Sequence, residues 1–127
     1  MSILFDSFKE WKAYCEESRK EIYEPVLRYE VEQKGKSEEE IWDGLAKAYQ
    51  VMKDAVQTGL TKDMNSYSGM IKGGAKKVAN YKTAVVSPEF QRLIARALAA
   101  KEVNSCMGKV VAAPTAGASG ILPGTMV

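Results

Sequence analysis

The last eighteen residues of this chain carry no charge, because no acidic or basic side chain follows Lys109 before the end at Val127. Two prolines and three glycines interrupt the stretch: Pro114, Gly117, Gly120, Pro123 and Gly124. A membrane-spanning helix needs about 20 mostly apolar residues and tolerates such breaks poorly, so a membrane span is not expected. The pattern instead predicts tightly folded, buried backbone that a small ligand can approach closely. Since chain ends are usually polar and frayed, we also expect a piece of a larger helical fold.

Composition sets the outer limits on fold and function. A length of 127 residues suits one domain, and 46% hydrophobic with 27% charged residues is ordinary for a soluble globular protein. The start of the chain lacks the basic region of a signal peptide, so a cytoplasmic location is expected. The complete absence of histidine removes the commonest general base and most zinc sites. Only Cys15 and Cys106 are present, which indicates no disulfide framework and too few thiolates for a four-iron cluster.

Charge is distributed unevenly along the chain. Residues 1–58 hold nine basic and thirteen acidic residues, whereas residues 59–127 hold nine basic and three acidic residues. A basic second half favours an anionic small molecule, although lysines that merely solvate helix surfaces explain it equally simply. Nucleic acid is not an expected partner, because the basic residues are neither clustered nor interleaved with aromatic residues.

Hydrophobic periodicity predicts an all-α fold of about five helices. The first two helices are expected over residues 6–17 and 19–34. The second should either start near Pro25 or kink there, and Gly35 should end it. Ser37 and Glu40 form a capping box for a third helix that Gly59 is expected to end. The apolar stripe of that helix has the strongest periodicity of the sequence: Ile41, Leu45, Ala48, Met52 and Ala55.

The second half adds two more helices and a long loop, without a strand. A short helix is expected from Gly74 to Tyr81, and another from the cap Ser87 and Pro88 to Ser105. The apolar face expected for the latter is Phe90, Leu93, Ile94, Ala97 and Leu98. Residues 59–74 form the loop, and loops of this length are usually functional or disordered. Its Ser66 and Ser68 hydroxyls and nearby glycines suit an anion, while a surface linker is the alternative.

The closing segment closely resembles a known family. The run from Cys106 to Gly124, CMGKVVAAPTAGASGILPG, is similar to the alpha chain of bacterial iron–sulfur L-serine dehydratases. The loop and helix start from Ser66 to Lys77, SYSGMIKGGAKK, also fits a family motif, though less strictly. The resemblance is close over residues 64–127 and looser over 38–63, and residues 1–37 show only helical character. It divides the chain into a helical scaffold, 1–58, and a substrate-site half, 59–127.

The resemblance implies deamination of L-serine to pyruvate and ammonia without pyridoxal phosphate. A [4Fe–4S] cluster with one open iron would act as a Lewis acid on the β-hydroxyl. One wall of the substrate site would be formed by Thr115, Ala116, Gly117, Ala118 and Ser119. The second wall would be Ser66, Ser68 and Gly69, with Lys76 as a further candidate for the substrate carboxylate. The general base is not identified by the resemblance.

The family's cluster cysteines lie beyond the position matching Val127, so this chain alone is predicted to bind no complete cluster and to be inactive. The implied partners are L-serine, a beta chain or domain and the remainder of the alpha domain, with a homo-oligomer also allowed. Two alternatives stay open: a pyridoxal-phosphate dehydratase with a phosphate-binding glycine turn, and a non-enzymatic helical module that binds a partner through exposed apolar surface.

Overall fold

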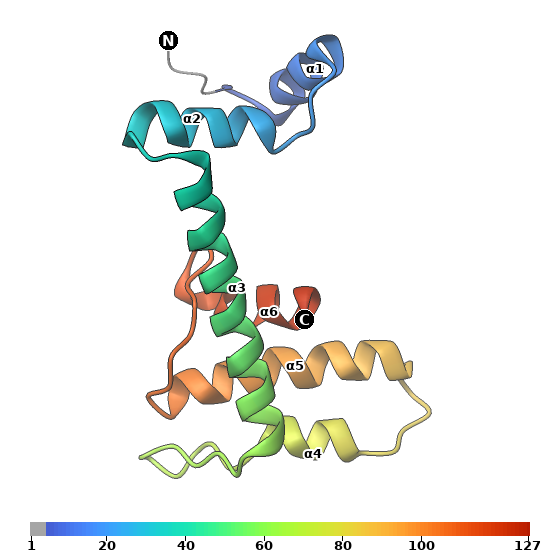
Figure 1. Ribbon diagram of the computed structural model, residues 1–127. Helices are drawn as coiled ribbons and strands as arrows, with labels where there is room; N and C mark the ends of the chain where they lie inside the picture. The colour runs from blue at the N-terminus through green and yellow to red at the C-terminus, as the bar shows by residue number, and fades with distance from the viewer. Residues whose placement is uncertain (1–4) are drawn as a thin grey trace. The chain divides into compact units, whose positions relative to one another are not determined.

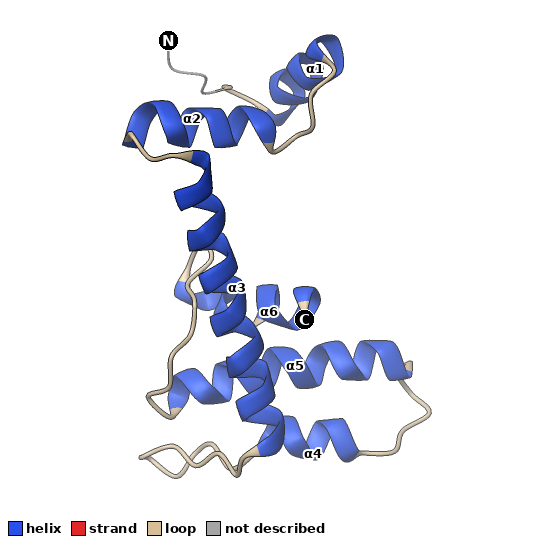
Figure 2. Cartoon of the chain, in the orientation of Figure 1, coloured by secondary structure: helices blue, strands red, loops and turns tan. Residues whose placement is uncertain are grey.

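The computed structural model describes residues 5–127, which are helical and contain no strand beyond one isolated bridge (Figure 2). The first four residues, on which the expected lack of a signal peptide partly rests, lie outside this range. Six α-helices and one 3₁₀ helix follow in order: α1 (Phe8–Ser18), α2 (Glu24–Lys34), α3 (Glu38–Thr61), α4 (Gly74–Asn80), α5 (Pro88–Ser105), η1 (Ala116–Ser119) and α6 (Ile121–Met126) (Figure 1). The all-α prediction is therefore confirmed.

The chain divides into two compact units, residues 1–46 and 47–127. In the first unit, the ends of the helices follow local rules. The Ser7 hydroxyl caps α1, and Gly35 ends α2 with a φ of 62°. The predicted capping box at α3 is confirmed, because the Glu40 amide donates to Ser37 Oγ at 3.2 Å and the Ser37 amide donates to the Glu40 carboxylate at 2.9 Å.

Helix α2 is shorter than predicted. It begins at Glu24 rather than near residue 19, because Arg19 adopts a left-handed conformation that ends α1 and the chain turns before restarting. Pro25 lies in the first turn, where its missing amide costs nothing. The expectation that the helix starts close to Pro25 is thus confirmed.

In the second unit, the C-terminal half of α3 packs across α5 at Gly59. This glycine is buried inside the helix, and a Cβ there would lie 2.6 Å from Ala99 Cα. The prediction that Gly59 ends the helix is wrong: α3 continues to Thr61, because the missing side chain serves a close helix crossing rather than a cap. The core around the crossing consists of Ala55, Val56, Ala100 and Val103.

Helix α5 starts as predicted but buries a different face. The Phe90 amide donates to Ser87 Oγ at 3.2 Å, with Pro88 in the first turn. The expected apolar face is wrong in part, since Phe90 is 53% and Leu98 is 37% exposed. Small residues face the neighbouring helices instead, because close crossings leave no room for larger ones: Ala95, Ala99 and Ala100 are fully buried.

The closing segment folds into two short helices rather than irregular backbone. The sequence did not predict α6, which contains Pro123 and Gly124, both buried. Gly120 and Gly124 lie against Ala97 of α5, where added Cβ atoms would meet Ala97 atoms at 2.6 and 2.9 Å. The predicted burial therefore holds at Ser119, Gly120, Pro123 and Gly124, whereas residues 114–117 and Ile121 are exposed. None of the described helices combines the length and apolar character needed to cross a bilayer.

Candidate functional site

The loop between α3 and α4 is held in shape by Ser66. Its amide donates to the Ile71 carbonyl at 3.2 Å, and its hydroxyl accepts from the Ile71 amide at 3.1 Å. The isolated bridge between Asn65 and Lys72 closes the same narrow turn, which Gly69 passes with a φ of 70°. Ser68 Oγ lies 3.1 Å from Ser66 Oγ. The three predicted residues of this wall therefore sit together in one organised turn.

The end of this loop is tied to α5 by Glu102, which sequence reasoning missed. Its Oε1 accepts from the Gly74 amide at 2.6 Å and from the Ala75 amide at 3.2 Å, satisfying two free donors at the start of α4. Glu102 is 6% exposed, and its Oε2 has no hydrogen-bond partner among the described residues. The only available signal was an acidic residue within the apolar pattern of a helix, in a half that contains three acidic residues.

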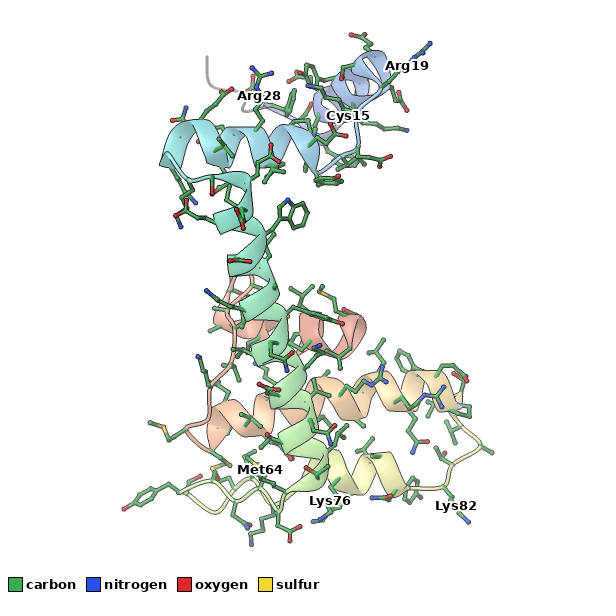
Figure 3. The ribbon with its side chains drawn as sticks, in the orientation of Figure 1. Cys15, Arg19, Arg28, Met64, Lys76 and Lys82 are labelled. Atoms are coloured by element: carbon green, nitrogen blue, oxygen red, sulfur yellow. The ribbon has the colours of Figure 1, made fainter. Side chains whose placement is uncertain are left out.

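A cavity of about 440 Å³ lies between the loop and α4. Its size falls within the usual range for small-molecule sites. Lys76, labelled in Figure 3, is the one predicted site residue that lines it. Its Nζ donates to Asp63 Oδ1 at 2.8 Å. This hydrogen bond, with the attraction of the ammonium charge, lowers the pKa of Asp63. Lys72 and Lys77 also line the cavity, so its positive charge exceeds its negative charge.

The other predicted wall, Thr115 to Ser119, is a capped 3₁₀ turn. Thr115 Oγ1 accepts from the Ala118 amide at 3.3 Å, and Ser119 Oγ donates to the Ala116 carbonyl at 2.6 Å. Ser119 is 1% exposed, so in this structure its hydroxyl supports the turn and does not face solvent. Thr115, Ala116 and Gly117 are exposed.

Within residues 5–127, no hydrogen bond joins the two predicted walls. Each is attached to α5 instead. Glu102 holds the start of α4, while the side-chain stem of Lys101 packs over Gly120, directly after the 3₁₀ turn. Consecutive residues near the end of α5 thus position both segments, although the cavity is lined by the loop and α4 alone.

No three His, Cys, Asp or Glu side chains of the described part gather closely enough to hold a metal ion. Cys15 is buried, as a small apolar residue would be. Cys106 is half-buried at the end of α5, where Met107 turns the chain with a φ of 63°. The residues described here therefore do not fit a four-iron cluster.

Comparison with known proteins decides the family. The model of the family described as serine dehydratase alpha chain matches residues 17–127. The chain belongs to this family. It is 39% identical over 117 residues to the L-serine dehydratase alpha chain of Peptoniphilus asaccharolyticus, covering 89% of this chain and 40% of that protein.

Two further relatives are less similar. The probable L-serine dehydratase alpha chain of Bacillus subtilis strain 168 is 32% identical over 126 residues, or 97% of this chain and 42% of that protein. The L-serine dehydratase of Streptomyces coelicolor is 33% identical over 110 residues, 80% of this chain and 23% of that protein. This serine dehydratase alpha-chain homologue spans less than half the length of these relatives. No solved structure matches it.

Proposed function

We propose that this chain forms the substrate-binding part of an L-serine ammonia-lyase, which converts L-serine to pyruvate and ammonia. The observation that carries the proposal is the family match over residues 17–127, which includes both predicted walls of the site. The structure adds support, because the wall that contains Ser66 is an organised turn beside a cavity with excess positive charge. Such a cavity suits the carboxylate of an amino acid.

Within this proposal, the chain's own residues bind and orient the substrate. The ammonium groups of Lys72 and Lys77 would attract the carboxylate, and Asp63 would compete with it for Lys76. The exposed Ser68 hydroxyl would contact the amino-acid head group. The Gly69 amide instead donates to the Ser66 carbonyl at 2.9 Å and holds the turn in shape. A bound [4Fe–4S] cluster would supply Lewis-acid assistance to loss of the β-hydroxyl in the whole enzyme. The described residues offer no ligand set for it, so we assign them no step of the elimination.

The implied partners follow from the relatives' names. Two of them are named as alpha chains, which suggests a beta chain or an equivalent domain as the partner of this protein. We also propose that the 127-residue chain needs further alpha-chain sequence for turnover, since it spans 40% of the Peptoniphilus protein.

The binding proposal is tested by titrating the isotope-labelled chain with L-serine and following its amide NMR signals. We expect shifts at Ser66–Lys77, with smaller shifts for L-alanine, which lacks the β-hydroxyl. Ser68→Ala should reduce the response, whereas Ser105→Ala, at the exposed end of α5, should not. Unchanged signals up to the solubility limit of L-serine would contradict the assignment of this loop.

A further inference from the structure

The first unit contains an apolar groove that the proposed function does not use. It encloses about 690 Å³ between α1, α2 and the first turns of α3, all within residues 1–46. Large apolar and aromatic side chains make up most of its walls: Trp11, Ile22, Tyr23, Val26, Trp42 and Leu45. Grooves of this kind between helices commonly receive an apolar helix face.

The apolar side chains that line the groove are exposed to an unusual degree. Ile22, Tyr23, Val26, Trp42 and Leu45 each remain 44–54% exposed. Isolated exposed apolar residues are ordinary, but a contiguous set marks an interaction surface. Tyr23 and Trp42 already pack edge to face, with ring centroids 5.8 Å apart, so part of the surface is ordered before a partner arrives.

The apolar stripe of α3 also indicates an interaction surface. Ile41 and Leu45 continue the helical spacing of Met52 and Ala55, which are buried in the second unit. The amphipathic pattern therefore specifies burial along the whole helix, yet Leu45 is 54% exposed. The buried Trp11 Nε1, which also lacks a hydrogen-bond partner among the described residues, is a second unsatisfied feature of the groove wall.

The acidic residues that line the groove indicate which kind of partner would bind there. The charged residues that line the groove are both acidic, Glu21 and Glu30. Glu30 pairs with Lys34 at 2.5 Å, but Glu21 makes no ion pair among the described residues. Residues 1–46 as a whole contain twelve acidic and seven basic residues. A partner edge with lysine or arginine is complementary to this surface, whereas an acidic edge is repelled.

We propose that this groove docks an amphipathic helix of a partner protein, with an apolar face on the groove floor and lysine or arginine along its edge. Addition of a strand is disfavoured, because the unit offers helices and no strand edge in residues 5–46. An anionic membrane surface is disfavoured by the acidic lining. The proposal does not rest on the dehydratase activity, and it develops the alternative of a helical interaction module.

The test uses the full 127-residue chain and its own fluorescence. The sequence contains two tryptophans, Trp11 and Trp42, and both line the groove, so their emission reports on this surface. The probe is a synthetic helix with leucine on one face and lysine on the other, and its control replaces every lysine by glutamate. We expect a saturable emission change with the lysine helix, weakened by salt, and affinity about tenfold lower for the glutamate helix.

Two groove variants and one control variant distinguish binding in the groove from non-specific binding. Leu45→Asp should weaken binding of the lysine helix about tenfold, whereas Val85→Asp, on a loop of the second unit, should leave it unchanged. Glu21→Lys, an exposed charge reversal that avoids the apolar floor, should weaken the lysine helix and strengthen the glutamate helix even if Leu45→Asp fails to fold. Far-ultraviolet circular dichroism checks that each variant is folded.

Three results would overturn the proposal. Tryptophan emission unaffected by the lysine helix would show that the groove does not bind it, and equal affinity for the two helices would show that charge does not select the partner. Self-association of the chain alone, measured by light scattering and abolished by Leu45→Asp, would assign the groove to a second copy instead.

Discussion

Two glycines of the same helix should respond oppositely to the same substitution. Gly59 lies at the crossing of α3 and α5, and a Cβ there would sit 2.6 Å from Ala99 Cα and closer still to the Ala99 carbonyl oxygen. Gly44 lies near the start of the helix, is exposed and has no atom within 4 Å of an added Cβ. Gly44→Ala is therefore a matched control for Gly59→Ala.

The magnitudes follow from helix propensity and packing. Alanine in a helix interior is favoured over glycine by about 1 kcal/mol, so Gly44→Ala should raise the free energy of unfolding by up to that amount. At Gly59 the same gain is opposed by the clash with backbone, which no side-chain rotation relieves. Overpacking costs about 1–3 kcal/mol, and a backbone clash belongs at the upper end, so a net loss of about 2 kcal/mol is expected.

Urea unfolding followed by far-ultraviolet circular dichroism measures both changes, and amide hydrogen exchange locates them. Gly59→Ala should raise exchange rates in α5 near Ala99, because the helices must separate to admit the methyl group. Gly44→Ala should slow exchange only in its own helix. If Gly59→Ala stabilised the chain as much as Gly44→Ala, the close crossing of α3 and α5 would be refuted.

Three further predictions concern the helix cap at Ser37, the ion pair between Asp63 and Lys76, and the expected absence of an iron–sulfur cluster. Ser37→Ala should lower stability by about 1 kcal/mol through loss of the capping box, measured by urea unfolding, and Ser37→Asp should restore most of it. Lys76 lowers the pKa of Asp63, so the pair's contribution to folding stability should be complete at neutral pH and lost as the pH falls below the ordinary pKa of 3.8. A carboxyl NMR titration should show the lowered pKa of Asp63, and Lys76→Met should remove the shift. Anaerobic iron–sulfur reconstitution of the 127-residue chain should give no stable [4Fe–4S] absorbance, and a persistent brown chromophore would contradict this expectation.

The features that could be read from the sequence are those decided within one turn of backbone. The Ser37–Glu40 capping box and the Ser87 cap depend on residues three apart, so the pattern itself contains both partners. The family motif likewise located the Ser66 turn, whose hydrogen bonds close within six residues. Local chemistry and the resemblance together were enough to find these elements.

The misread features depend on contacts between distant segments. A glycine such as Gly59 is typical of a helix end. Only its contact with Ala99, forty positions away, shows that α3 and α5 cross here. Helix α6 contains a proline and a glycine, but Pro123 occupies a first turn and Gly124 is required by contact with Ala97. The role of Glu102 depends on the Gly74 amide, which lies 28 positions away in the sequence.

Helix α5 explains how the two predicted walls can belong to one site without touching. Lys101 and Glu102 are consecutive, and consecutive side chains of an α-helix point about 100° apart. The segments that Glu102 and Lys101 contact therefore lie on different sides of α5. Under the proposed function, a substrate held by these two walls needs a further side to exclude water, which we expect from the rest of the proposed enzyme. Glu102→Ala tests this role of α5, because it should loosen the loop without disturbing the turn at Thr115.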